Sequence, residues 1–127
     1  LGTPTIGEYS TIAGGRTNIT LGVHSSILGG EANQIDVGGT EATIAGGRAG
    51  IASANNSTVS GGSANTASGP NSTVSGGQEN IASGTESTVS GGALNTASGN
   101  NATVSGGVSR TSSGTNDWRA GSLFEEE

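Results

Sequence analysis

The sequence predicts an all-β fold, a parallel β-solenoid or β-roll of about seven 15-residue coils, with two short strands in each coil. Three observations predict this fold. Gly-Gly pairs recur at intervals of 15, 17, 15, 15, 15 and 15 residues, beginning at residues 14–15 and ending at 106–107. A β-branched apolar residue stands two positions before each pair. Glycine occurs 25 times in 127 residues, and each copy would weaken a helix by about 1 kcal/mol.

Each repeat follows the consensus S-T-V-S-G-G-x-x-N-x-A-S-G-x-x and divides into two strands of period two. In one repeat these strands cover residues 57–60 and 65–68. Because side chains alternate between faces, Val59 and Ala67 are expected to point inward. The threonines and serines beside them then point outward.

Three glycines per repeat are expected at the corners of the coil. In the same repeat these are Gly61, Gly62 and Gly69. Corners often require a positive φ, which only glycine adopts at little cost. We therefore predict positive φ at these glycines.

Two columns of equivalent residues are expected along the stack of coils, one in the core and one that stabilises the turns. The predicted core has one β-branched residue per coil: Ile12, Ile27, Ile44, Val59, Val74, Val89 and Val104. The predicted structural ladder consists of asparagines that follow the Gly-Gly pairs: Asn18, Asn33, Asn65, Asn80 and Asn95. Stacked amides can bond the coil above and the coil below.

The repeat pattern divides the chain into two parts. Residues 1–116 are predicted to form the solenoid, with a partial first coil at 3–7. Residues 117–127 are predicted to form a C-terminal cap and an acidic tail, in which Trp118 and Phe124 close the last hydrophobic layer. The single 17-residue unit contains Gly38-Gly39 and is expected to form a bulged corner.

The units STVSGGSANTASGPN (57–71), STVSGGQENIASGTE (72–86) and STVSGGALNTASGNN (87–101) resemble the head repeats of trimeric autotransporter adhesins of the YadA-like type. This resemblance covers roughly residues 3–116. It implies a left-handed parallel β-roll, a homotrimer, and display on the bacterial outer membrane as a virulence-associated adhesin. The chain differs from the family pattern in its period of 15 where 14 is usual, and in Gly61 where an aliphatic residue is common.

Composition argues against most other functions. The net charge is −6, and four arginines with no lysine provide no basic patch for nucleic acid or for an anionic membrane. Cysteine is absent and His24 is the only histidine, so we expect no catalytic site, no metal site and no cofactor. No run of apolar residues is long enough to cross a bilayer. A non-enzymatic protein is predicted.

The variable residues of the repeat gather at the two corners, where a solenoid usually varies its binding surface. The candidate ligand-facing residues are Arg16, His24, Glu31, Arg48, Gln78, Glu79 and Glu86. Leu94 and Val108 are apolar at the same kind of position and are expected to face a neighbouring subunit. The expected ligand is an extracellular matrix component or another surface.

Two alternatives to an adhesin remain open at this stage. The outward column Thr43, Thr58, Thr73, Thr88 and Thr103, with serines two residues further on, resembles the flat face of ice-binding solenoids. The same column is also what β-propensity alone produces on a solvated strand. The second alternative is a purely structural segment of a phage or extracellular fibre. We favour an extracellular or cell-surface adhesin head that attaches by multivalent contacts.

Overall fold

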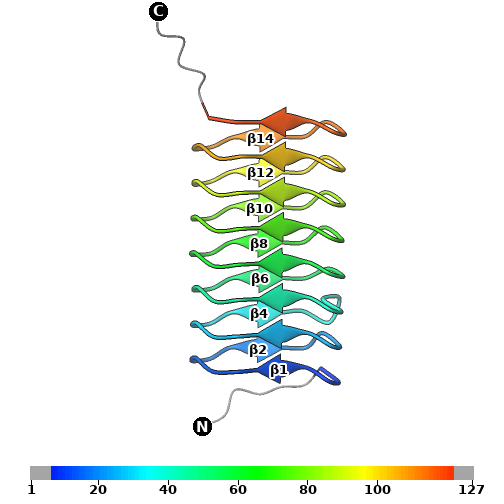
Figure 1. Cartoon of the computed structure of the whole chain (residues 1–127), viewed down its shortest axis with the longest axis vertical. Helices are drawn as coiled ribbons and strands as arrows, with labels where there is room; N and C mark the ends of the chain where they lie inside the picture. Colours follow the sequence, from blue (N-terminus) through cyan, green and yellow to red (C-terminus); the bar gives the residue numbers. More distant parts are fainter. Residues whose placement is uncertain (1–6, 122–127) are drawn as a thin grey trace, which may run out of the picture.

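The computed structural model describes residues 7–121, which form one straight stack of flat coils (Figure 1). The described residues contain fifteen strands of two residues each and no helix. The strands are β1 (Thr11–Ile12), β2 (Ile19–Thr20), β3 (Ser26–Ile27), β4 (Gln34–Ile35), β5 (Thr43–Ile44), β6 (Ile51–Ala52), β7 (Thr58–Val59), β8 (Thr66–Ala67), β9 (Thr73–Val74), β10 (Ile81–Ala82), β11 (Thr88–Val89), β12 (Thr96–Ala97), β13 (Thr103–Val104), β14 (Thr111–Ser112) and β15 (Trp118–Arg119). The prediction of an all-β parallel solenoid is confirmed.

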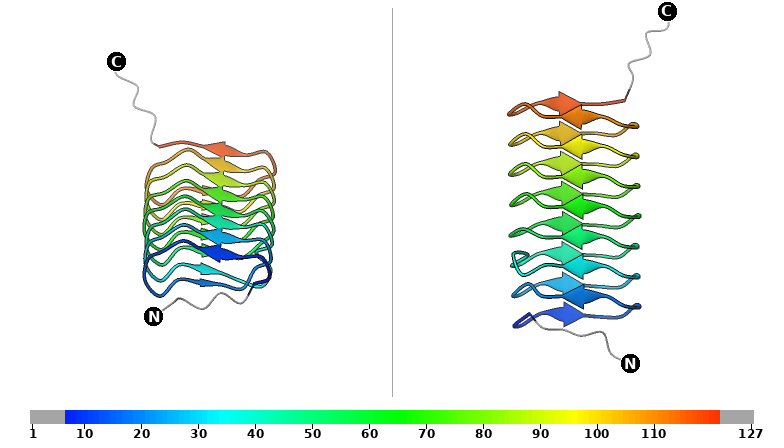
Figure 2. Two further views of the ribbon diagram at one scale, coloured as in Figure 1. Left: turned by 60° about the horizontal axis from the view of Figure 1, so that its bottom comes forward. Right: turned by 180° about the vertical axis from the view of Figure 1, so that it is seen from behind.

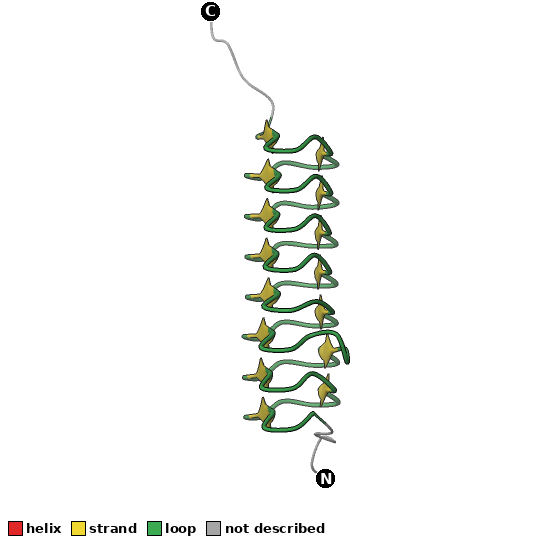
Figure 3. Ribbon diagram, turned by 90° about the vertical axis from the view of Figure 1, so that its right-hand side faces the viewer, coloured by secondary structure: helices red, strands yellow, loops and turns green. Residues whose placement is uncertain are grey.

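The strands make two parallel sheets that face each other across a narrow interior (Figures 2 and 3). Odd-numbered strands form an eight-stranded sheet, which we call the odd sheet, and even-numbered strands form a seven-stranded even sheet. Each strand pairs with the strand one coil away, so that Thr58 lies beside Thr73 and Ile81 beside Thr96. Residues one repeat apart in the sequence therefore lie in adjacent coils of the rod.

The strands are shorter than the four residues expected, although ladder bonding extends past them. The Thr58 N–H donates to the Ser72 carbonyl at 2.9 Å, and the Ser60 N–H donates to the Val74 carbonyl at 3.0 Å. The chain bends away soon after each such pair because a corner follows. The coil-to-coil hydrogen bonds, more than strand length, hold the stack together.

The interior contains one large apolar column and one small one. Buried in the odd sheet are Ile27, Ile44, Val59, Val74, Val89 and Val104, while Ile12 at the first coil is only partly buried. Facing them in the even sheet are mainly alanines: Ala52, Ala67, Ala82 and Ala97. One side chain of each kind per coil makes a thin core.

The 17-residue coil differs from the others at one corner and in one core residue. Val37 and Gly38 are additional residues at the corner between β4 and β5, and Val37 is exposed. Within the same coil, Ile35 takes the place that alanine has in later coils and is completely buried. The largest buried side chain of the even-sheet column therefore belongs to the longest coil. The predicted core did not include Ile35.

The prediction of positive φ at three glycines per repeat is correct for the second glycine of each pair, and among residues 7–121 the first glycine has a positive φ only at Gly106. Gly62 has a φ of 83°, whereas Gly61 and Gly69 lie outside the left-handed region. Gly69 is required for space, since a Cβ there would lie 2.0 Å from the Gly84 carbonyl oxygen of the next coil. A Cβ on Gly61 would meet nothing within 4 Å.

The C-terminal end differs from the expected boundary at residue 116. Strand β15 pairs with β13 and continues the odd sheet, with Trp118 beside Thr103. Trp118 is 65% exposed, and its Nε1–H donates to the Ser105 hydroxyl at 2.7 Å. Because it continues the outward column, Trp118 does not cover the end of the core. Phe124 and the partial coil at residues 3–6 lie outside the described residues.

A buried serine column offers a test of packing in this fold. The hydroxyl of Ser87 is buried without a hydrogen-bond partner, and Ala102 occupies the same place one coil later. Ser87→Ala is expected to raise the free energy of unfolding by about 1 kcal/mol, because an unsatisfied buried hydroxyl is removed. Ser25→Ala should lower it by at least a similar amount, since Ser25 donates to the Gly22 carbonyl at 2.7 Å and also pairs with the buried Thr20 hydroxyl. Urea unfolding of both variants measures the difference, and equal effects would contradict this interpretation.

Candidate functional site

Two corners join the sheets in every coil, and both place side chains on the surface of the rod. The Gly-Gly corner follows each odd strand and includes residues 61–64 in the repeat 57–71. The opposite corner follows each even strand and includes residues 69–71 in the same repeat. We describe first what holds these corners in place and then what they expose.

The Gly-Gly corner is held by the asparagine that follows it. The Asn80 Nδ2 donates to the Gly76 carbonyl of its own coil and to the Gly92 carbonyl of the next, both at 2.9 Å. Its Oδ1 accepts from the Asn95 N–H at 3.0 Å. The side chain is completely buried. Each such asparagine therefore closes its own corner and bonds the backbone of the following coil.

The same arrangement recurs at every asparagine of the set, and all are buried: Asn18, Asn33, Asn65, Asn80 and Asn95. The bonds run from amide to backbone and not between amides. The column is interrupted once, where Gly50 stands in place of asparagine and donates its N–H to the Asn33 Oδ1 at 2.8 Å. At its end, the Arg110 N–H donates to the Asn95 Oδ1 at 2.9 Å.

The interruption at Gly50 is expected to be repairable. In Gly50→Asn, a new amide would reach the Gly46 and Gly62 carbonyls by analogy with the neighbouring coils. The added Cβ would lie 3.1 Å from the Asn33 Oδ1 and 3.3 Å from the Val59 Cγ1, so small shifts are needed. We expect a net gain of about 1 kcal/mol in the free energy of unfolding, because two hydrogen bonds outweigh this crowding.

The matched control for this repair is Gly46→Asn, at a position where a Cβ would meet nothing within 4 Å. This variant should leave the free energy of unfolding nearly unchanged. Thermal unfolding followed by circular dichroism compares the two. A lower melting temperature for Gly50→Asn would contradict the predicted repair.

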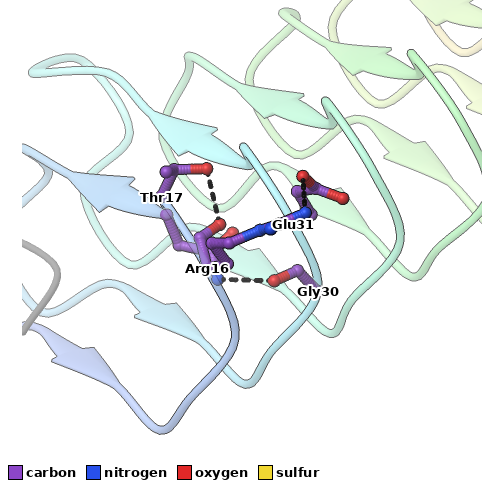
Figure 4. A network of polar contacts seen from close by, with 5 residues as sticks. Arg16, Thr17, Gly30 and Glu31 are labelled. Carbon is purple, nitrogen blue, oxygen red and sulfur yellow. Dashed lines mark hydrogen bonds and ion pairs between the residues drawn. The ribbon is translucent and has the colours of Figure 1, made fainter. Parts of the chain in front are cut away.

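The Gly-Gly corner is charged near the N-terminal end of the rod. Glu31 lies between Arg16 and Arg48 in a column of parallel bridges. The Arg16 Nη2 donates to the Glu31 Oε1 at 2.6 Å, and the Arg16 N–H donates to the Gly30 carbonyl at 2.9 Å (Figure 4). The Arg16 side chain is 75% exposed, so this ion pair contributes little to stability. Arg48 is exposed as well.

Toward the C-terminal end the same corner becomes polar and then apolar. The Gln78 Nε2 donates to the Glu79 Oε1 at 2.9 Å, and both side chains are exposed. One and two coils further on, Leu94 is 52% exposed and Val108 is 64% exposed. Both apolar side chains are thus uncovered in the single chain.

The opposite corner carries the remaining candidates. His24 is exposed, and its ring lies 5.2 Å from the ring of Tyr9, centroid to centroid. Glu86 is exposed at the equivalent position four coils later. Tyr9 had not been identified as a candidate because an isolated aromatic in a weakly repetitive segment gives no sequence signal.

Non-glycine residues in the left-handed region are the feature that the repeat did not indicate. Fifteen occur among residues 7–121, and in a regular coil each corner has one, such as Ala64 with a φ of 54° and Asn71 with 57°. Their backbone N–H groups bond the preceding coil, as Ala64 does to the Arg48 carbonyl at 2.9 Å. These bonds offset the cost of the conformation, and the side chains are directed outward.

The threonine column lies on the outer face of the odd sheet, at the half-buried positions Thr43, Thr58, Thr73, Thr88 and Thr103. It is bounded by Ser26 at one end and by Trp118 at the other. Trp118 projects from this face, so the flat surface ends there.

Within residues 7–121, no group of three or more histidine, cysteine or acidic side chains is placed to hold a metal ion. In the same part of the chain, no helix has the length and apolar character needed to span a membrane.

Comparison with known proteins found a match to one coil of the rod. The family model of the ubiquitous surface protein adhesin repeat matches residues 72–84. The chain is similar to a surface adhesin. The matched segment covers strands β9 and β10 with the Gly-Gly corner between them, which is the unit that the other coils repeat. No curated protein matches the chain.

This match, together with the parallel β-solenoid, confirms the resemblance to head repeats of trimeric autotransporter adhesins. The matched model describes a repeat of a surface protein adhesin. The ice-binding and purely structural alternatives are not favoured by this finding.

Proposed function

We propose that the chain is the rod-shaped head segment of a bacterial adhesin, exposed outside the cell, and that it attaches to host matrix, to cells or to other surfaces. The observation that carries the proposal is the adhesin repeat at residues 72–84, within a rod whose coils share the same backbone. A rigid rod presents its corners in regular rows, so that individually weak contacts add. The corner residues identified from the sequence, Arg16 and Glu86 among them, are the proposed contacts.

We further propose that the rod is a left-handed roll and assembles as a homotrimer. The resemblance to adhesin heads supports this state, and so does the thin interior, with one large apolar residue per coil. Leu94 and Val108 are exposed apolar residues that a neighbouring subunit would cover. Trimerisation would also multiply the number of contacts that each rod can make.

Light scattering after gel filtration tests the assembly. A homotrimer is expected to have about three times the chain mass of 12.1 kDa. Beads coated with the chain should adhere to mammalian cells or to immobilised matrix proteins, whereas beads coated with albumin should not. A mass of one chain would contradict the trimer, and beads that adhere to none of these surfaces would contradict the adhesin.

A further inference from the structure

One row of side chains on the opposite corner differs in composition from the equivalent row on the Gly-Gly corner, where alanine holds three of the seven described non-glycine left-handed positions. At the left-handed position of this corner, each coil has a polar or aromatic residue: Tyr9, His24, Glu41, Asn56, Asn71, Glu86, Asn101 and Asn116. All eight are exposed, with φ between 54° and 58°. We call this row the polar ridge.

The backbone of the polar ridge is fixed by hydrogen bonds between coils. The Asn71 N–H donates to the Asn55 carbonyl at 2.9 Å, and the Asn101 N–H donates to the Thr85 carbonyl at 2.8 Å. Successive ridge residues therefore follow one another at the spacing of parallel strands, about 4.8 Å. The backbone that carries the side chains is a rigid array, so only the side chains themselves need ordering when a ligand binds.

The hydrogen-bonding capacity of these side chains is unused. Among residues 7–121, the ridge amides of Asn56, Asn71 and Asn101 donate no hydrogen bond to protein, whereas the Asn80 amide in the interior donates two. Asparagine tolerates the left-handed backbone better than most residues other than glycine, so these positions suit it without any bond from its side chain. The exposed amides are therefore available to a ligand.

We propose that the polar ridge binds a neutral polysaccharide that lies along the rod, an inference that rests on the proposed adhesin function and names its ligand class. Each asparagine amide offers both donors and an acceptor, which matches the hydroxyl groups of a sugar. Tyr9 and His24 add two exposed rings at the N-terminal end, whose apolar faces can pack against the C–H groups of a sugar ring.

Charge distinguishes this ligand from polyanions. Glu41 and Glu86 lie on the ridge, and the arginines within the described residues belong to the Gly-Gly corner, the asparagine column or β15. Sulfated or sialylated chains would meet carboxylates with no cation beside them. The ridge thus favours an uncharged ligand.

The ridge is also a poor match for a peptide. Extended peptides bind by joining the edge of a sheet or by occupying an apolar groove. The ridge backbone N–H groups already bond the preceding coil, and the ridge residues from Glu41 to Asn116 are all polar. A hydroxyl-rich chain is the ligand that such an array of free amides and carboxylates fits best.

The test uses the full 127-residue chain on a printed array of neutral, sialylated and sulfated oligosaccharides. The ridge variant combines Asn56→Gly, Asn71→Gly and Asn101→Gly, which removes three amides and suits the left-handed backbone. The control variant combines Ala49→Gly, Ala64→Gly and Ser109→Gly, the same backbone change at φ of 53°, 54° and 54° on the Gly-Gly corner.

We expect the unmodified chain to bind neutral oligosaccharides, and the ridge variant to bind them at least about tenfold more weakly, a change equivalent to 1.4 kcal/mol. The control variant should bind like the unmodified chain. Equal binding by the ridge variant, or binding to sulfated chains alone, would overturn the proposal.

The same experiment separates this proposal from the adhesin proposal. If beads coated with the chain adhere to cells or matrix proteins while no neutral oligosaccharide is bound, the ridge assignment fails and the adhesin stands. If the beads adhere to no surface and the array shows no binding, both fail.

Discussion

Asn80→Ala is expected to lower the free energy of unfolding by about 3–5 kcal/mol, because buried groups in two coils lose their partners. The Gly76 carbonyl accepts a hydrogen bond from the Asn80 Nδ2 at 2.9 Å. The Asn95 N–H donates one to the Asn80 Oδ1 at 3.0 Å. The Gly92 carbonyl retains its bond from the Gln78 N–H and loses only one of two. A buried cavity adds to the cost.

Urea unfolding followed by circular dichroism measures this loss, and hydrogen exchange locates it. The Asn95 amide should exchange faster in Asn80→Ala, since its acceptor is removed. Asn101→Gly is the matched control, because Asn101 is exposed on the polar ridge and lies in the left-handed region. It should unfold within about 1 kcal/mol of the unmodified chain. Equal losses in the two variants would show that the buried amide does not hold the corner.

Gly84→Ala is expected to have the second large effect, a loss of more than about 3 kcal/mol, through overpacking between coils. A Cβ on Gly84 would lie 2.0 Å from the Gly99 carbonyl oxygen and 2.5 Å from the carbonyl carbon. Both atoms are backbone in the next coil, so no side chain can move aside. The coils must separate locally, which lengthens the bonds between them.

Gly76→Ala provides the control for steric space, because a Cβ there meets nothing within 4 Å and its φ lies outside the left-handed region. This variant is expected to be as stable as the unmodified chain or slightly more stable. Thermal unfolding of the two alanine variants compares their melting temperatures. The prediction for Gly84 fails if both variants melt together.

Ala54 shows why the position, and not the residue type alone, sets this cost. It occupies the Gly84 column one coil after the insertion, and its N–H contacts the Ser57 hydroxyl at 3.4 Å. The Gly84 N–H instead donates to the Ala97 carbonyl of the next coil at 3.2 Å. The backbone hydrogen bonding at Ala54 therefore differs from that at Gly84, and a methyl group is accommodated there.

The fold could be predicted because the sequence has two periodicities. Alternation of period two indicates which side chains face inward, and the repeat length indicates which residues of successive coils pair. Val59 and Ala67 are inward by alternation, and the interval of 15 residues places Val74 directly beside Val59. The corner side chains could be identified by their variability alone. Their presentation could not, because the left-handed backbone of Ala64 and Asn71 depends on bonds from the preceding coil.

The two residues of a Gly-Gly pair also differ in ways that the sequence does not predict. Gly61 and Gly62 are identical in sequence, yet only Gly62 has a positive φ and a neighbouring coil that excludes a Cβ. Ile35 is a further example, since its burial accompanies the two additional residues at Val37 and Gly38. Contacts between coils distinguish these positions, and such contacts leave no pattern within a single repeat.

The sequence by itself determined the parallel solenoid, its register and the columns that face inward, because a constant period forces equivalent residues to stack. Only the tertiary structure decided what those columns do. It showed that the buried asparagines bond backbone across coils, whereas the asparagines of the polar ridge keep their amides free. The physical reason is that a hydrogen bond depends on the distance and direction of atoms in the adjacent coil, which residue identity alone does not specify.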